Sequence, residues 1–295
     1  MTELSTSTAA RRKKLRRAAL QAFLITMSVI WVLPIAWAIY TSFRPYDETA
    51  KYGYVSIAGT YNLDNYVNSF NQGQLPMYFM NTVIILVPAV ILVLFLSSMM
   101  AFTVSRYSWR FNLILLMVFY GANLLPPQVI ITPLFRMYLA IPMFAPLSDN
   151  GLLYDQYIGI TLIHVAFQMG FCTFVLSNYM KTIPKALNEA AVVDGASVWK
   201  TYWTIILPLP RPALAALATL QVTWIYNAFF WALILMKTGA KYPITSALNN
   251  LQGEFFTNNN LVAAGSVLVA LPTLIVFFLL QKQFVSGLTL GSTKE

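Results

Sequence analysis

Six long stretches of the chain are apolar on nearly every side of a helical wheel, and polar segments separate them. Helices buried in a large soluble core would instead show a polar face at a 3.6-residue period. Each stretch reaches the roughly 20 residues with which a helix crosses a hydrocarbon core about 30 Å thick. We therefore predict an all-α integral membrane protein with six transmembrane helices, at residues 18–43, 77–104, 111–135, 156–180, 205–236 and 257–282.

The composition supports this prediction. Of the 295 residues, 58% are hydrophobic and only 10% are charged, whereas soluble domains carry about 25% charged residues. The first apolar stretch is 26 residues long, which exceeds the roughly 7–15 of a cleavable signal peptide. We expect it to be retained, behind a basic tail at residues 1–17 that has no regular structure. Cys172 is the only cysteine, so we expect no internal disulfide and no cysteine-based metal site.

The basic residues are distributed unequally between the connecting segments. Six spans place both termini on one side, and that side carries fourteen of the nineteen basic residues. Because lysine and arginine gather on the cytoplasmic side, we expect both termini in the cytoplasm of a bacterial-type inner membrane. The net charge of +9 then reflects orientation and contact with anionic headgroups rather than nucleic-acid binding. The cytoplasmic set is Arg11, Arg12, Lys13, Lys14, Arg16, Arg17, Arg106, Arg110, Lys181, Lys185, Lys200, Arg211, Lys282 and Lys294; the opposite set is Arg44, Lys51, Arg136, Lys237 and Lys241.

The third apolar stretch holds three prolines within ten residues, Pro126, Pro127 and Pro133. Proline removes a helical hydrogen bond, so we expect this helix to open, and a translocation path would explain the opening. Amides and aromatic rings elsewhere in the spans would suit a neutral, hydroxyl-rich solute; the alternative is that they hydrogen-bond between helices. The candidate pore-lining residues are Tyr120, Asn123, Gln128, His164, Gln168, Gln221, Trp224 and Asn227.

His164 is the only histidine, and no carboxylate lies within a predicted span. Proton-coupled transporters place Asp, Glu or several His residues in the membrane, so we favour an interhelical histidine over a proton relay. The same absence argues against a membrane hydrolase that uses paired carboxylates. The sequence also lacks the Gly-x-x-x-x-Gly-Lys-Ser/Thr phosphate loop, so we expect no ATP site in this chain.

A polar segment at residues 181–204 separates the fourth and fifth apolar stretches. We predict two short helices joined at Gly195, where glycine permits a turn that a residue with a Cβ resists. The small face formed by Ala190 and Ala191 suits insertion into a groove of a partner protein. The alternative is a segment that lies on the lipid headgroups, anchored by Trp199, Tyr202 and Trp203.

Residues 189–208, EAAVVDGASVWKTYWTIILP, resemble the cytoplasmic EAA loop of ABC importer permease subunits. That pattern reads Glu-Ala-Ala, three residues, Gly, nine residues, then Ile-x-Leu-Pro. The wider segment, with its DGAS string, and the tail from Phe284 are similar to the carbohydrate branch, the second, maltose-type membrane subunit. The matching residues, with the aspartate of that string, are Glu189, Ala190, Ala191, Asp194, Gly195, Ile205, Leu207 and Pro208.

The resemblance implies a transport subunit without enzymatic activity or a cofactor of its own. In that family the EAA loop docks into an ATPase subunit, which binds ATP and Mg. The implied partners are a second permease subunit, two nucleotide-binding ATPase subunits and an extracytoplasmic solute-binding protein, and the implied cargo is a sugar or oligosaccharide. The tail at 285–295 would reach between the ATPases, and the loop at 238–253 would project toward the solute-binding protein.

Three alternatives stay open. A permease for another solute, such as glycerol phosphate, would favour a basic lining, which the spans lack. An ATP-independent secondary transporter or channel would move its solute without an ATPase. A membrane scaffold would move no solute even with the ATPase and the binding protein present.

Overall fold

The computed structural model describes residues 2–57, 59–123, 126–251 and 257–289. Within these ranges the regular structure is helical, and a single isolated β-bridge pairs Pro142 with Leu152. The chain divides into two compact units, Met1–Gln72 with Leu251–Leu268, and Gly73–Asn250 with Val269–Glu295. The boundary falls within the last helix, α13 (Asn259–Thr289).

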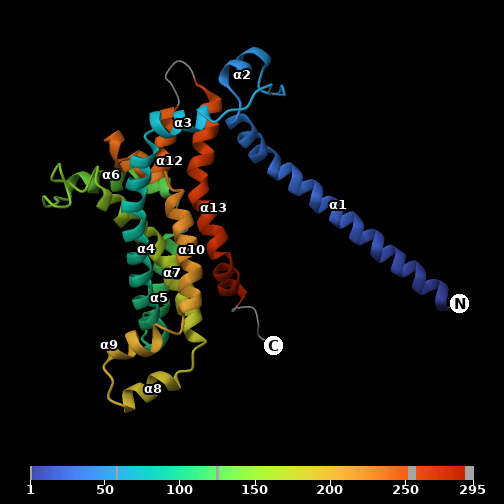
Figure 1. Ribbon diagram of the computed structural model, residues 1–295. Helices are drawn as coiled ribbons and strands as arrows, with labels where there is room; N and C mark the ends of the chain where they lie inside the picture. Colours follow the sequence, from blue (N-terminus) through green and yellow to red (C-terminus); the bar gives the residue numbers. More distant parts are fainter. Residues whose placement is uncertain (1, 58, 124–125, 252–256, 290–295) are drawn as a thin grey trace. The chain divides into compact units, whose positions relative to one another are not determined.

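The first unit contains α1 (Thr2–Ser42), α2 (Tyr46–Tyr52), α3 (Asp64–Gln72) and the start of α13 (Figure 1). The prediction that residues 1–17 lack regular structure is wrong, because α1 already begins at Thr2. The reason lies in the local sequence, where alanine, leucine, lysine and arginine favour a helix and no glycine or proline occurs before Pro34.

A buried arginine organises the segment after α1. Arg44 is 0% exposed, and its guanidinium donates to the carbonyl oxygens of Gly53 and Tyr54 and to Ser56 Oγ. The Arg44 carbonyl oxygen accepts from the side-chain amides of Asn65 and Asn260 at 2.8 and 2.9 Å. Because Asn65 lies on α3 and Asn260 on α13, this one residue joins both helices to the end of α1.

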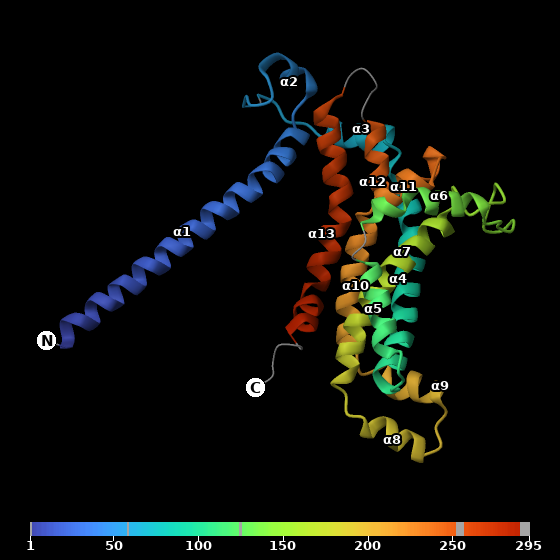
Figure 2. The ribbon, with the colours of Figure 1, turned by 180° about the vertical axis from the view of Figure 1, so that it is seen from behind.

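The second unit is built on α4 (Leu75–Arg106), α7 (Tyr157–Lys181) and α10 (Arg211–Tyr226), which lie side by side (Figures 1 and 2). One face of α4 carries the fully buried Ala89, Val93, Ser97 and Ala101 at four-residue intervals. Small residues at this spacing let two helices approach closely, and Ser97 Oγ donates to the Met169 carbonyl on α7 at 3.2 Å.

The third predicted span is broken as the prolines indicated. It consists of α5 (Asn112–Ala122), a 3-10 turn η1 (Pro127–Ile130) and α6 (Ile131–Ala140). The helix also continues past the predicted end at residue 135, because Pro142 is the next proline and nothing before it interrupts α6.

The fifth predicted span, 205–236, is wrong as a single helix. It comprises the end of a π-helix, η2 (Thr201–Ile206), then α10, a break, and α11 (Phe230–Leu235). The segments Val198–Ile206 and Arg211–Tyr226 meet at 83°. Three prolines between residues 208 and 212 remove backbone donors at the bend. The short elements η3 (Gly239–Lys241), α12 (Ile244–Ala247) and η4 (Leu248–Leu251) follow α11.

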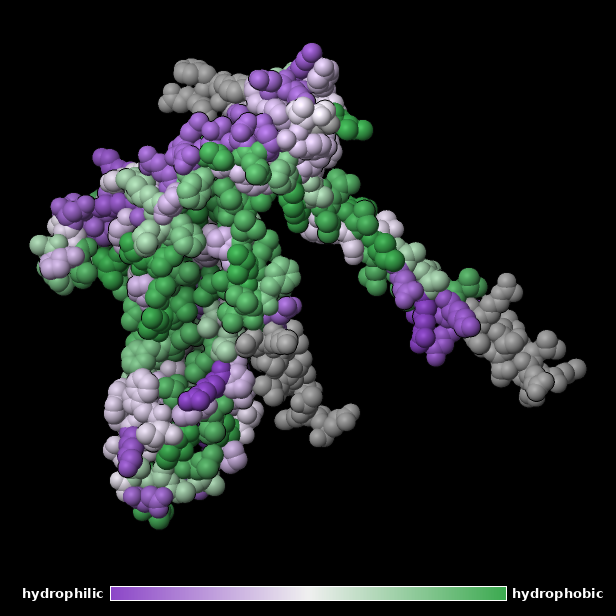
Figure 3. All heavy atoms as spheres, in the orientation of Figure 1, coloured by the Kyte–Doolittle hydropathy of each residue, from purple (hydrophilic) through white to green (hydrophobic). Residues whose placement is uncertain are grey.

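Four helices of the described part are apolar and long enough to cross a membrane, and the bent pair counts as a fifth if it is one span. The surface of the second unit is apolar over the middle of its helices and more polar toward both ends (Figure 3). This banding is what a bilayer requires of a protein that spans it. The four helices are Arg12–Ser42, Leu75–Arg106, Tyr157–Lys181 and Asn259–Gln281.

Candidate functional site

The EAA loop leaves α7 at Lys181 and forms α8 (Ala186–Val193), α9 (Val198–Lys200) and η2 before it enters α10. Both views place α8 and α9 together at one end of the second unit, beside the C-terminal end of α4 (Figures 1 and 2). The two short helices and the turn predicted from the sequence are therefore present.

Gly195 ends α8 in a left-handed conformation, with φ at +72°. Its N–H donates to the Val192 carbonyl at 3.0 Å, and the Ala196 N–H donates to the Ala191 carbonyl at 2.9 Å. This pair of bonds is the Schellman termination of a helix. A Cβ at Gly195 would meet nothing within 4 Å, so glycine is required by the backbone angle, which costs other residues roughly 1–2 kcal/mol, and not by lack of space.

The motif residues of α8 point in two directions. Glu189, Ala190 and Asp194 are exposed, whereas Ala191 is buried at 3% exposure. The predicted partner-facing surface of both alanines is therefore wrong for Ala191. A helix turns by about 100° per residue, so Ala191 faces the interior while Ala190 faces out. The apolar side chains beside them that remain open to a partner are Leu187, Val192, Val193 and Val198.

The Ile-x-Leu-Pro part of the motif forms the bend into α10. Ile205 and Leu207 are partly buried against the core formed by α4, α7 and η2, and the Leu207 N–H donates to the Tyr202 carbonyl at 2.8 Å. Pro208 follows where the helix turns away. Tyr202, one of the three expected interfacial anchors, is instead 2% exposed, and its hydroxyl lies 2.7 Å from Ser98 Oγ on α4. Trp199 and Trp203 remain exposed.

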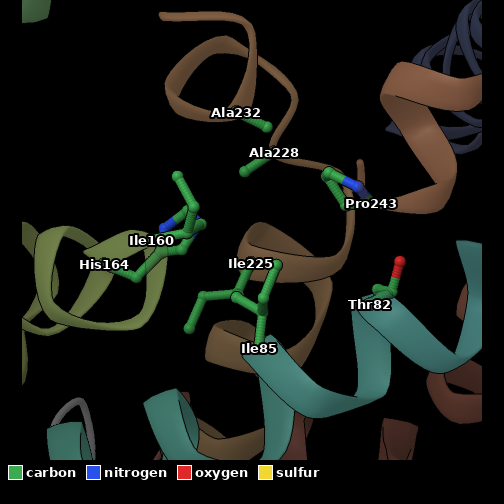
Figure 4. Close-up of a pocket in the computed structure, with 8 residues that line it drawn as sticks. All are labelled: Thr82, Ile85, Ile160, His164, Ile225, Ala228, Ala232 and Pro243. Carbon is green, nitrogen blue, oxygen red and sulfur yellow. The ribbon is translucent and has the colours of Figure 1, made fainter. Parts of the chain in front are cut away.

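Three of the candidate pore-lining residues, Gln168, Gln221 and His164, lie between helices of the second unit. Gln221 on α10 is 0% exposed, and its Nε2 donates to Cys172 Sγ at 3.1 Å and to Gln168 Oε1 at 3.5 Å. His164 is buried beside a cavity of about 10 Å³ (Figure 4), a size at the limit for one water. Thr82 is the other polar residue in its lining, beside Ile85, Ile160, Ile225, Ala228, Ala232 and Pro243.

The other candidates are divided differently. Trp224 on α10, Asn227 directly after it and Gln128 in η1 are exposed. Asn123, directly after α5, is partly buried and donates to the Phe119 carbonyl on α5 at 3.0 Å. The Tyr120 side chain lies outside the described residues. The structure therefore brings Gln168 and Gln221 together, but it does not gather all eight candidates on one surface.

The chain matches the model of the family described as "Binding-protein-dependent transport system inner membrane component" over residues 76–289. This chain belongs to that family. It is similar to the diacetylchitobiose uptake system permease protein NgcG of Streptomyces coelicolor, with 28% identity over 92% of this chain and 87% of the relative. It is also 29% identical to the probable starch degradation products transport system permease protein AmyC of Thermoanaerobacterium thermosulfurigenes, over 95% and 100% of the two chains.

Among solved structures, a chain of a bacterial ABC transporter involved in the import of alginate superposes on this permease with a TM-score of 0.77. The sequences are 20% identical, and the match covers 93% of this chain and 98% of the other. This likeness shows the fold. Together the family and the relatives identify an ABC importer permease subunit of the carbohydrate branch, which is a multi-pass membrane protein and a transport subunit rather than an enzyme.

At the opposite end of the permease, carboxylates fix the segment after α11, a feature that the sequence did not reveal. Asp155 has a positive φ of 63° and accepts from the Lys237 N–H, the Thr238 N–H and the Thr238 hydroxyl. Burial opposes its ionisation, but the Thr238 and Lys237 hydrogen bonds lower the pKa of Asp155 overall. Lys241 donates to Asp149 at 2.7 Å, and this bond, together with a hydrogen bond from Gln156, lowers the pKa of Asp149 to about 2.

Proposed function

We infer that this permease forms half of the translocation path for a sugar or oligosaccharide and is coupled to a separate ATPase through its EAA loop. The observation that carries the coupling role is the shape of that loop. Its backbone is closed by Gly195, its Ala191 is buried, and Glu189, Val193 and Asp194 are left exposed at the tip. An exposed apolar tip with carboxylates beside it fits a groove on a soluble protein, because water and lipid headgroups would leave the valines unburied.

A sugar as cargo is supported by the two relatives, whose names refer to diacetylchitobiose and to starch degradation products. The chemistry of the chain agrees with a neutral solute, since amides and an indole, as in Gln168, Trp224 and Asn227, supply donors, acceptors and an apolar face. A permease for another solute such as glycerol phosphate remains the alternative. A basic lining would favour that alternative. Among the described residues, the side-chain hydrogen bonds of Gln168 and Gln221 involve no lysine or arginine.

A second permease subunit would explain the surfaces that this chain leaves open. Trp224 on α10 and Asn227 directly after it are exposed, and the apolar part of α1 is unburied within its own unit. An exposed amide within a bilayer lacks water to bond to. A partner subunit, or a hydrated path between the two subunits, would supply its hydrogen-bond partners. A further partner, a solute-binding protein outside the membrane, is supported by the family description, which refers to a binding-protein-dependent transport system. Both termini and the EAA loop then face the cytoplasm, where two ATPase subunits with ATP and Mg would meet them.

The experiment is uptake and ATPase co-purification with the assembled importer in proteoliposomes. We expect Glu189→Lys and Gly195→Asp to abolish co-purification or uptake while the permease still inserts in the membrane. Asp47→Lys is the matched control, because Asp47 is an exposed carboxylate in the first helical turn of α2, which belongs to the first unit and not to the unit that contains the loop. Normal ATPase capture and uptake by both loop variants would refute the coupling role. Uptake by the purified permease without any ATPase would instead favour a channel or secondary transporter.

A further inference from the structure

One face of the cytoplasmic half of α4 contacts both ends of the EAA loop: the departing arm, residues 180–183, and the returning arm at Tyr202. Ser98, Phe102 and Arg106 recur at four-residue intervals and so lie above one another on that helix. Each of them contacts a residue at the beginning or the end of the loop.

The departing arm is held by Arg106, the last residue of α4. Its Nη1 donates to the Ile183 carbonyl at 3.0 Å and its Nη2 to the Met180 carbonyl at 2.8 Å. Met180 is in the last turn of α7, and Ile183 lies two residues beyond the end of that helix. The carbonyls at the end of a helix lack helical partners, and the rigid fork of a guanidinium can bind two of them at once.

The returning arm is held by Ser98 and Phe102. The Tyr202 hydroxyl is 2.7 Å from Ser98 Oγ, and the Tyr202 ring lies 5.3 Å from the Phe102 ring, centroid to centroid. Tyr202 is nearly fully buried, as are Ser98 and Phe102. The two arms are thus attached to one helix, although α8 and α9 separate them in the sequence.

We propose that this α4 face is the connection through which movement of the EAA loop reaches the transmembrane helices, with Arg106 and Tyr202 as its positioning residues. The proposal rests on the coupling role of the loop proposed above. Because α4 packs closely on α7, where Ser97 Oγ donates to the Met169 carbonyl, a pull on the loop that is passed to α4 moves the two helices together. If the arms are released, the loop follows the ATPase alone, and ATP is hydrolysed without transport. ATP binding can shift the permease between its two conformations only through contacts that differ between those conformations.

Arg106 has a competing explanation, since a cytoplasmic arginine also orients a span by its charge. The two explanations separate with lysine, which keeps the charge but lacks the bidentate fork. Arg110 supplies the control: it is on the same connecting segment, is exposed, and stacks on Phe111 instead of contacting the loop.

The test is the number of ATP molecules hydrolysed per solute imported, measured with the complete importer in proteoliposomes. We expect Arg106→Lys to raise this ratio on the order of tenfold, the size of a lost charge-assisted hydrogen bond, while the ATPase still co-purifies. Tyr202→Phe and Ser98→Ala, which keep the packing but remove the hydroxyl pair, should raise it by a smaller factor. Arg110→Lys should leave it unchanged.

An unchanged ratio in Arg106→Lys and in both hydroxyl variants would overturn the proposal. So would a loss of the ATPase from all three, since that result assigns the α4 face to assembly alone. If Arg106→Lys fails to insert, the hydroxyl variants decide the outcome by the same ratio. Failure of the underlying coupling role is recognised separately, because it would show as normal uptake in Glu189→Lys.

Discussion

Gly170 on α7 marks a close approach between α7 and α5, and substituting it tests that packing directly. A Cβ built on Gly170 would lie 2.2 Å from the Phe119 carbonyl oxygen on α5 and 2.5 Å from Nδ2 of Asn123, the residue after α5. Ordinary contact begins at 3.4 Å, so α5 would have to retreat by about 1 Å. The obstacle is backbone rather than a flexible side chain, which places the cost near the upper end of the roughly 1–3 kcal/mol found for overpacked cores.

Gly121→Ala is the matched control, since it adds the same methyl group to α5 at a site with nothing within 4 Å. Both substitutions gain helix propensity of up to about 1 kcal/mol, so their difference isolates the clash at about 3 kcal/mol. With about 2–4 °C per kcal/mol, the apparent melting temperature of the detergent-solubilised importer should fall about 6–12 °C further for Gly170→Ala than for Gly121→Ala. Equal melting temperatures for the two variants would refute the close approach of α5 and α7.

Two further predictions concern charged residues. Arg44→Met removes the donor to three acceptors in the first unit and should cost about 1–3 kcal/mol, the cost of leaving hydrogen-bond partners unsatisfied. Lys51→Met, an exposed control, should change the melting temperature by less than about 2 °C, and equal effects of the two variants would contradict the network. The depressed pKa of Asp149 makes its contribution to stability full above about pH 4 and lost as the pH falls toward 2. Melting temperatures measured from pH 5 to pH 3 should therefore fall more steeply for the wild type than for Lys241→Met, and parallel curves would contradict this.

The helices and the EAA loop followed from the sequence because their causes are local. Long apolar stretches, three prolines in ten residues and a glycine after a short helix each act on their own neighbourhood. The fifth span illustrates the limit: its composition indicates one helix, but the 83° bend depends on how prolines 208, 210 and 212 combine with a π-helix and with contacts to α4. Apolarity fixes which residues avoid water and leaves the direction of the chain open.

The charged residues show what sequence reasoning misses. Arg44 and Arg106 were both counted as orientation charges, yet the structure uses each as a donor to backbone carbonyls. Asp155 carried no motif, although it receives three hydrogen bonds from Lys237 and Thr238. These partners lie 82 and 83 residues away in the sequence, and a local sequence pattern does not predict contacts between residues so far apart. The candidate pore residues divided for the same reason. Gln221 and Trp224 both contact α7, but helical spacing does not reveal that Gln221 is buried and Trp224 exposed.

The residues of the EAA motif fall into two groups in the structure: those that shape the loop and those that are exposed on it. Gly195 closes the backbone of α8, Ala191 packs inward, and Ile205 and Leu207 lie against the core at the bend. These four residues give the loop its form, so substituting them changes shape before it changes any contact. Glu189, Ala190 and Asp194 are exposed and are the motif residues of α8 and its C-cap that a partner can reach. If the loop docks on an ATPase as we propose, recognition of one ATPase over another would depend on these three residues and on the exposed valines beside them. The buried members of the motif would instead be shared by loops that bind different partners.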